Sequence, residues 1–127
     1  MNLLKYTAIT FIVIAASATD AAPSYLTGRS LRDTIKGQTL IAKDWAEFYQ
    51  SDGTIIGKVR YLGIRDYTGK WEALENRICY SYPRKDQDRC SRLTLDGNTI
   101  THYDLSGKQK KDGVAHRFPG NSLDQFK

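Results

Sequence analysis

The chain has 127 residues, and its 19 Lys and Arg against 14 Asp and Glu give a formal net charge of +5. This length fits one domain with one modest core rather than a multidomain protein. With two cysteines and no Cys-x-x-Cys pair, the sequence also lacks the thiol ligands typical of a zinc site.

The first residues have the pattern of an export signal. Lys5 precedes an apolar run from Ala8 to Ala16, and the small residues Ala16-Ser17-Ala18 predict cleavage after Ala18. The run is too short to cross a bilayer as a helix, and no cysteine follows it directly to carry a lipid. We therefore expect a periplasmic or secreted protein that does not span a membrane. Its predicted parts are a signal peptide at 1–18, a polar leader at 19–29 and a single domain at 30–127.

The charge of the predicted mature chain favours an acidic partner. Lys5 is the only charged residue among the first 18, so a net charge of +4 remains after cleavage. Exported proteins rarely meet nucleic acid, which leaves an acidic protein or an anionic envelope polymer as the expected partner. The alternative is that the charge only keeps the protein soluble. No pattern in the sequence indicates a cofactor.

The two cysteines, Cys79 and Cys90, are expected to form a disulfide in the oxidising compartment that the signal predicts. Closing a loop this short stabilises a fold by roughly 2.5–3 kcal/mol in the chain-entropy model. A metal site on these thiols would need more ligands, and the nearest histidine is His102. We therefore interpret the pair as a structural disulfide.

The chain after the leader predicts one short helix followed by strands. Ser30 is placed to cap a helix, Asp33 follows three residues later, and Gly37 is a stop signal. Leu31 and Ile35 lie one turn apart and form one apolar stripe on this helix. After Gly37 the pattern alternates between apolar and polar residues, with turn signals at short intervals, which is typical of an all-β protein.

Six hairpins follow from the turn signals, since paired residue numbers in an antiparallel ladder have a constant sum. The predicted pairs are Phe48 with Gly57, Val59 with Trp71, Trp71 with Tyr80, Cys79 with Cys90, Leu93 with His102, and His102 with His116. These registers place one apolar set on a common inner face: Ala46, Phe48, Ile55, Val59, Tyr61, Trp71, Ala73, Ile78, Tyr80, Tyr82, Leu93, Leu95, Ile100, Val114 and Phe118. A one-residue slip at any turn would turn the next strand inside out.

The fold class that follows is all-β, a seven- to eight-stranded antiparallel up-and-down meander that closes into a small barrel, with one short N-terminal helix. A two-sheet sandwich is the alternative. The opposite face is polar, and the disulfide lies on it. Four apolar side chains break this pattern and point outward: Trp45, Tyr49, Ile56 and Leu62. The helix is expected to cover some of them or to plug one end of the barrel.

The long loops gather at one end of the predicted meander, at Gly63–Tyr67, Pro83–Arg89 and Leu105–Asp112. Long loops at one end mark a default binding face. A basic set lies in them, and it forms our candidate binding site: Arg65, Arg84, Lys85, Arg89, Lys108, Lys110 and Lys111. The alternative interpretation is a set of solvated surface charges.

Two other groups of residues are weaker candidates. The predicted register pairs His102 with His116, and Asp104 would add a third metal ligand only if a bulge turned it toward them. Core or barrel-mouth histidines are the more common outcome, so no metal is predicted. An aromatic set is expected to fill the core rather than line a ligand cavity: Tyr61, Trp71, Tyr80 and Tyr82.

The sequence favours a protein that is not an enzyme. It contains no Gly-x-Ser-x-Gly turn, no phosphate-binding glycine loop and no His-Glu-x-x-His helix, and pairing of the cysteines removes a free thiol. A convergent acid–base pair stays open as an alternative. The leading hypothesis is a non-catalytic envelope protein that contacts an acidic partner through its basic loop end. The second is a carrier of a small apolar ligand inside the barrel.

A resemblance extends over most of the predicted mature chain. Its residues are Phe48-Tyr49-x-x-Asp52-Gly53-Thr54-x-x-Gly57, Gly69-x-Trp71, Ile78-Cys79-Tyr80, Cys90 and Gly120-Asn121. This pattern resembles small exported proteins of unknown function that are common in alphaproteobacteria. The Gly-x-Trp motif and the barrel are also similar to lipocalin-type folds and to small periplasmic inhibitors of lysozyme or metalloproteases. The latter resemblance implies a fold only, because no inhibitor motif is evident.

Overall fold

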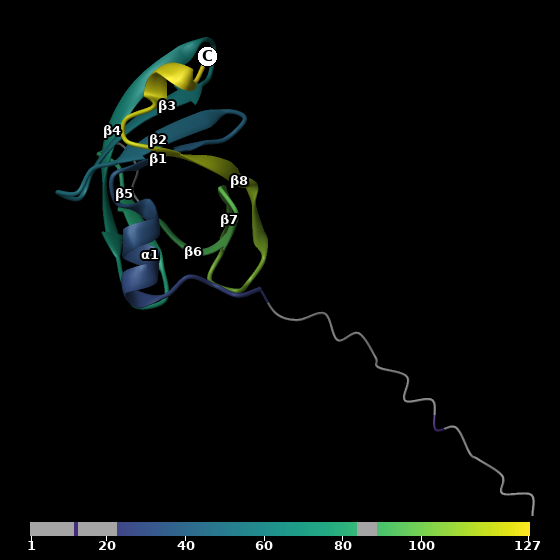
Figure 1. The fold of residues 1–127 in the computed structure, drawn as a ribbon. Helices are drawn as coiled ribbons and strands as arrows, with labels where there is room; N and C mark the ends of the chain where they lie inside the picture. The colour runs from purple at the N-terminus through teal and green to yellow at the C-terminus, as the bar shows by residue number, and fades with distance from the viewer. Residues whose placement is uncertain (1–11, 13–22, 84–88) are drawn as a thin grey trace, which may run out of the picture.

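The computed structural model describes residue 12, residues 23–83 and residues 89–127. The predicted signal peptide and residues 19–22 of the predicted leader lie outside these ranges, apart from residue 12. Eight antiparallel strands form a closed barrel in up-and-down order, which confirms the predicted fold class. The elements are α1 (Gly28–Ile35), β1 (Gln38–Ile41), β2 (Trp45–Tyr49), β3 (Thr54–Arg60), β4 (Ile64–Ala73), β5 (Ile78–Ser81), β6 (Arg89–Asp96), β7 (Thr99–Tyr103), β8 (Gln109–Pro119) and the 3-10 helix η1 (Leu123–Gln125) (Figure 1).

The strand β1 closes the barrel, because it pairs with β2 on one side and with β8 on the other. Thr39, for example, lies between Phe48 of β2 and Phe118 of β8. A ladder that returns to its first strand leaves no free edge, so the sandwich alternative is wrong.

The helix α1 begins at Gly28, two residues before the predicted cap at Ser30. Its first N–H donates to the carbonyl of Glu75 in the β4–β5 turn (2.7 Å), so a tertiary hydrogen bond replaces a side-chain cap. Gly37, with φ of 71°, ends the helical segment as predicted. Among the described residues, no helix is long and apolar enough to cross a membrane.

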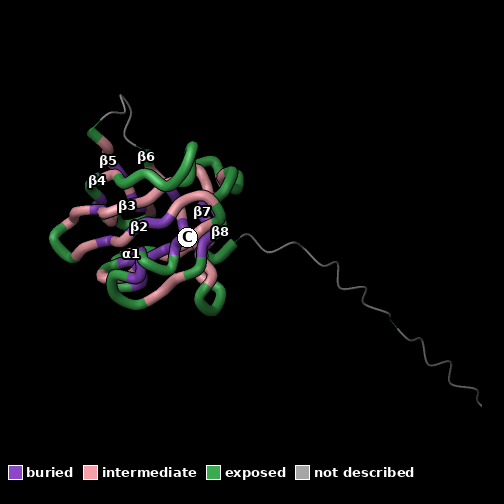
Figure 2. Tube along the Cα trace, turned by 90° about the horizontal axis from the view of Figure 1, so that it is seen from above, coloured by how far each residue is buried: buried purple, intermediate pink, exposed green. Residues whose placement is uncertain are grey.

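The plug that we expected from α1 is present. Leu31 and Ile35 are fully buried and belong to the main core, together with Tyr49, Trp71 and other residues of the barrel interior. Because α1 also contacts the β4–β5 turn, it occupies the end of the barrel where the tight turns lie. Figure 2 shows buried positions along the strands and exposed positions at the turns.

Three of the six predicted registers are confirmed. Trp71 pairs with Tyr80, Cys79 with Cys90, and Leu93 with His102. The disulfide between Cys79 and Cys90 is formed, with 4.0 Å between the two Cα atoms, and it joins β5 to β6.

The predicted register of β2 against β3 is wrong by one residue, because Phe48 pairs with Ile56 and not with Gly57. The Gln50 N–H donates to the Thr54 carbonyl (2.9 Å), which leaves a three-residue turn whose last residue, Gly53, has a φ of 91°, as in a common three-residue hairpin loop. This slip reverses β2, so that Trp45, Glu47 and Tyr49 face the interior.

The outer face of β2 is covered by the C-terminal segment, which makes a second, smaller core. Ala46 is fully buried there against Leu123 and Phe126, and Phe48 packs at its side. Figure 1 shows this segment beside β2 and β3. Both faces of β2 are therefore covered by protein, which explains why its apolar residues do not alternate.

Two further registers are corrected. The β3–β4 turn is tight and lies at Tyr61–Gly63, so the predicted loop Gly63–Tyr67 belongs mostly to β4, and Tyr61 is 67% exposed rather than inside. In β8 the pairing shifts at a bulge: Thr101 pairs with Val114, but Tyr103 pairs with Gln109. Val114 is therefore exposed and its neighbour Ala115 is buried, the reverse of the prediction.

Candidate functional site

The end of the barrel away from α1 holds a pocket of about 780 Å³. We call it the mouth pocket, and its lining consists of Trp45, Glu47, Tyr49, Val59, Asp66, Tyr67, Thr68, Tyr80, Tyr82, Pro83, Arg89, Ser91, His102, Lys110, Lys111, Asp112 and Gly113. The β3–β4, β5–β6 and β7–β8 connections lie at this end, because turns alternate between the ends of an up-and-down barrel. These are the three connections in which the sequence placed the candidate binding face; the β3–β4 and β7–β8 connections are shorter than expected.

Tyrosine side chains fill much of the pocket wall, and two glycines make room for them. A Cβ atom on Gly57 would overlap the ring of Tyr67, and one on Gly69 would lie 2.7 Å from the ring of Tyr82. Tyr67 and Tyr82 also meet edge to face, with 5.8 Å between ring centroids. The glycines on β3 and β4 therefore position these two rings across the inside of the barrel.

Glu47 of β2 lies deep in the pocket, with 8% of its surface exposed. Desolvation raises the pKa of its carboxyl group to about 7, partly opposed by hydrogen bonds from Tyr82, Tyr67 and Tyr49. The Tyr82 hydroxyl donates to both carboxyl oxygens at 3.1 Å. Among the described residues the ion pairs are Lys58–Asp66 and Arg60–Asp44, so none of the described cations pairs with this carboxylate.

Two further buried polar groups line the pocket. The Tyr80 hydroxyl, in a residue 7% exposed, has no hydrogen-bond partner of normal geometry among the described residues, although it lies near Ser91. His102 is 5% exposed, and its Nδ1 lies 2.9 Å from the Gly113 carbonyl, to which it donates. Burial lowers the pKa of His102 to about 4, so its imidazole is neutral near pH 7.

Three members of the predicted basic set line the mouth pocket: Arg89, Lys110 and Lys111. Arg65 and Lys108 are exposed but do not line it, and Arg84 and Lys85 lie outside the described residues. The loop assignment was wrong for four of the set, because Arg65 lies in β4, Arg89 in β6, and Lys110 and Lys111 in β8.

Lys110 has a structural role that the sequence did not show. Its Nζ donates to the Cys90 carbonyl (2.9 Å) and to Ser91 Oγ (2.7 Å), which ties the bulge of β8 to β6. Burial, and then the charge of Arg89, lower its pKa. On the other side of the mouth, Trp45 Nε1 donates to the Asp112 carbonyl (2.9 Å), which joins β2 to β8 beyond the end of the short strand β1.

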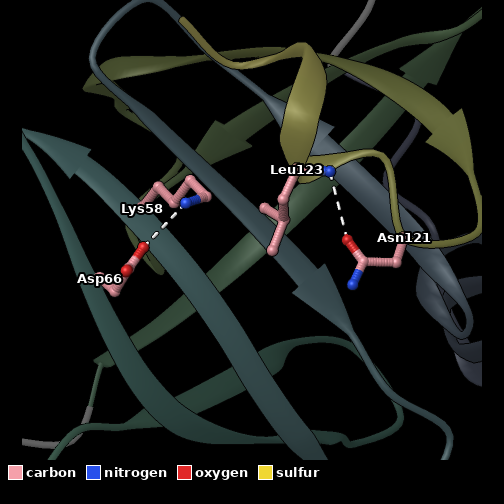
Figure 3. A network of polar contacts seen from close by, with 4 residues as sticks. All are labelled: Lys58, Asp66, Asn121 and Leu123. Carbon is pink, nitrogen blue, oxygen red and sulfur yellow. Dashed lines mark hydrogen bonds and ion pairs between the residues drawn. The ribbon is translucent and has the colours of Figure 1, made fainter.

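One acidic member of the lining is already neutralised. Lys58 of β3 and Asp66 of β4 form an ion pair with an N–O distance of 2.9 Å (Figure 3). Leu123, in the same view, is turned toward the sheet, and its N–H donates to Asn121 Oδ1 (3.2 Å). Because Asp66 pairs with Lys58, its negative charge offsets less of the positive charge of Arg89 and Lys111.

The predicted pairing of His102 with His116 is wrong. His116 lies opposite Thr99 on the exposed side of β8, whereas His102 points into the barrel. The cause is the β8 bulge, which shifts the register by three residues and reverses the strand. Asp104 accepts hydrogen bonds from Ser106 and Lys108 and shapes the β7–β8 turn. Over residues 23–83 and 89–127, no three His, Cys, Asp or Glu side chains are placed to hold a metal.

The aromatic prediction is right for part of the set. Trp71 and Tyr80 are buried in the main core, but Tyr80 and Tyr82 also line the mouth pocket. The sequence missed Glu47, Tyr49 and Tyr67 as pocket residues. The available signal was the run Trp45 to Tyr49, in which a charged residue is in phase with two aromatic side chains.

Comparisons with protein-family models, curated proteins and solved structures found no match for this chain. A function is therefore proposed from the mouth pocket, whose size, aromatic wall and buried polar groups are the features that bear most directly on ligand binding.

Proposed function

We propose that the protein is an exported, non-catalytic binding protein, similar to lipocalins in its barrel, which holds a small molecule in the mouth pocket. The observation that carries this proposal is a pocket of about 780 Å³ at the one barrel end that α1 does not plug. Ligand pockets fall in this range of volumes and combine aromatic walls with a few buried polar groups. The disulfide between Cys79 and Cys90 supports the export part of the proposal.

The lining favours a ligand that is partly aromatic and partly polar over the wholly apolar ligand of our sequence hypothesis. Glu47, Tyr80 and His102 would each lose hydrogen-bonding opportunities to water against a purely apolar molecule. Tyrosine rings offer faces and edges to a planar group. Arg89 and Lys111, nearer the solvent, supply the charge for an anionic substituent at the rim.

A dye with these properties provides the test. We expect 8-anilinonaphthalene-1-sulfonate, which has aromatic rings and one sulfonate, to bind the folded protein and to fluoresce more strongly. Val59→Trp on the inner face of β3 should weaken this binding at least tenfold, because the indole fills the pocket. Thr94→Trp on the outer face of β6 is the matched control and should bind the dye as the native protein does.

The circular dichroism spectra of both variants should match that of the native protein, so that exposure of a disordered core does not explain the dye signal. Equal dye affinity in Val59→Trp and Thr94→Trp would contradict binding in the mouth pocket.

The basic side chains at the mouth favour a second candidate function, binding of an acidic protein or an anionic envelope polymer. Arg89 and Lys111 face the opening, and the nearby Asp66 is paired with Lys58. Such binding would depend strongly on salt, whereas binding inside the pocket would not. A small anionic group and a polymer would use the same cations, so the two functions are compatible.

A further inference from the structure

The carboxyl group of Glu47 is the group in the mouth pocket whose burial is balanced least by its described neighbours. It is almost fully buried, faces a pocket and has no cationic partner among the described residues. We propose that the floor of the mouth pocket binds a primary or secondary ammonium group of the ligand, with Glu47 as its counter-ion and the Tyr80 hydroxyl as an additional acceptor. This inference rests on the proposed function and specifies the ligand class.

Charge balance is the first argument. A buried carboxylate is stable only when it is paired, strongly hydrogen bonded or protonated. One of the basic residues in the pocket lining, Lys110, is already held by the Cys90 carbonyl and Ser91 Oγ. Because none of the described cations pairs with this carboxylate, the proposed ligand supplies the positive charge.

Hydrogen-bond capacity is the second argument. An ammonium group of this kind is a donor only, and it needs acceptors on the protein. The Tyr82 hydroxyl donates to both oxygens of Glu47, and the hydroxyls of Tyr67 and Tyr49 also bond to this carboxylate. A carboxylate has about four acceptor sites, so capacity remains for a ligand N–H. The Tyr80 hydroxyl, 93% buried and without a partner of normal geometry, supplies another acceptor in the same pocket lining.

The surroundings are the third argument. Tyr49, Tyr67 and Tyr82 carry electron-rich ring faces, which attract organic cations. A quaternary ammonium ion would gain this attraction but could not donate to Glu47 or Tyr80. The structure therefore favours an ammonium group with N–H bonds, attached to an apolar or aromatic body that packs against the tyrosine rings of the pocket.

The test compares three ligands with the same aromatic body at pH 8: 2-phenylethylammonium, 2-phenylethanol and 3-phenylpropanoate. Affinities come from two-dimensional ¹H–¹⁵N NMR titrations of the folded protein, which also locate the binding site. We expect the cation to bind at least tenfold more tightly than the alcohol, and the carboxylate more weakly than the alcohol. Trimethyl-(2-phenylethyl)ammonium should bind more weakly than the primary ammonium ion.

Two variants test whether the preference for the cation over 2-phenylethanol depends on Glu47 and Tyr80. Glu47→Gln keeps the shape of the side chain and should remove the preference for the cation over 2-phenylethanol. Glu72→Gln, on the exposed side of β4, is the matched control and should leave the preference unchanged. Tyr80→Phe should weaken cation binding several-fold with little effect on stability, because the hydroxyl that it removes has no partner of normal geometry in the part of the chain that the structure describes.

The pH dependence gives a readout that a purely structural role of Glu47 would not produce. The pocket groups that face it are Tyr49, Tyr67, Tyr80 and Tyr82, with His102, Lys110 and Arg89 farther around the lining. Burial raises the pKa of these tyrosines above its ordinary range and lowers that of His102 to about 4. Affinity for 2-phenylethylammonium should therefore rise between pH 5 and 8 as Glu47 ionises, by up to tenfold per pH unit.

The possible results separate the two proposals. If the alcohol and the cation bind equally at the mouth pocket, the ammonium inference is overturned and the proposed function stands. If none of the three ligands shifts the signals of the mouth-pocket residues, both proposals fail. If Glu47→Gln does not fold, Tyr80→Phe and the pH profile of the native protein still decide the inference.

Discussion

Two buried residues, Glu47 and His102, have opposite effects on the pH dependence of stability. The folded pKa of Glu47, about 7, is above its ordinary value of 4.5, so the folded protein binds the extra proton and stability falls as pH rises from 4.5 to 7. The folded pKa of His102, about 4, is below its ordinary value of 6.5, so stability falls as pH drops from 6.5 to 4. Between pH 4.5 and 6.5 the two effects cancel.

Single variants should reveal each effect separately. We expect the free energy of unfolding of Glu47→Gln to rise between pH 4 and 6.5 by up to about 3 kcal/mol, because the effect of His102 is then no longer cancelled by that of Glu47. His102→Gln should show the reverse, a decrease of similar size between pH 4.5 and 7. Urea denaturation at intervals of one pH unit measures both. Parallel profiles for the native protein and the two variants would show that neither group is buried as described.

At the same scale, Glu47 shows where prediction from the sequence was limited. The predicted register put Ala46 and Phe48 inside, so by alternation Trp45, Glu47 and Tyr49 fell outside, where a charged residue is normally solvated. The structure keeps Glu47 inside because the hydroxyl groups of tyrosines on other strands reach its carboxyl group. The contact with Tyr82 joins residues far apart in the chain, so the local sequence shows only that Glu47 is in phase with Trp45 and Tyr49 and not which partners it meets.

At the scale of elements, a register error of an odd number of residues assigned the side chains of a strand to the wrong faces, whereas an even error did not. The β2–β3 and β7–β8 registers are wrong by odd shifts, which reversed β2 and β8. The β3–β4 register is wrong by six residues, an even shift, so β4 kept its inner face. The errors come from turns with weak signals: a three-residue loop, a leucine with positive φ at Leu62, and the bulge near Asp112.

The disulfide joins two elements that the sequence paired correctly, and its contribution can be measured. We expect the double variant Cys79→Ser, Cys90→Ser to fold with a free energy of unfolding about 3 kcal/mol lower than that of the native protein, because its unfolded chain is less restricted. Urea denaturation gives the difference. Adding reductant should destabilise the native protein by a similar amount and leave the double variant unchanged; equal stability of the two proteins without reductant would contradict the role of the disulfide.

At the scale of the whole molecule, the two ends of the barrel differ in what they offer to an anionic partner. The barrel end with the mouth pocket carries the exposed residues Arg89, Lys108 and Lys111, whereas α1 and the residue that follows it, at the other end, carry the exposed residues Arg29, Arg32 and Lys36. The sequence predicted that the β3–β4, β5–β6 and β7–β8 connections share one end, because the up-and-down strand order fixes that. It did not predict the second basic surface, because the orientation of α1 depends on its contact with the β4–β5 turn.

This arrangement supplies a charge-matched experiment on polymer binding. We expect replacement of Arg89, Lys108 and Lys111 by Ser to weaken heparin binding at least tenfold, about 1.4 kcal/mol, at low salt. Replacement of Arg29, Arg32 and Lys36 by Ser removes the same charge from the other end and should have a much smaller effect. Lys110 is left in place because its hydrogen bonds join β8 to β6. Heparin chromatography measures both variants, and equal losses would show that net charge alone controls binding.

The pairing of β1 with β8 has a consequence for how the chain matures. Gln38 lies beside Pro119, so the first and last strands of the barrel meet only after nearly the whole polypeptide is available. A chain still being synthesised can form its central hairpins, but it keeps two unpaired strand edges until β8 is available to pair with β1. During synthesis, closure therefore waits for β8, and Leu123 and Phe126, which cover the outside of β2, are added later still.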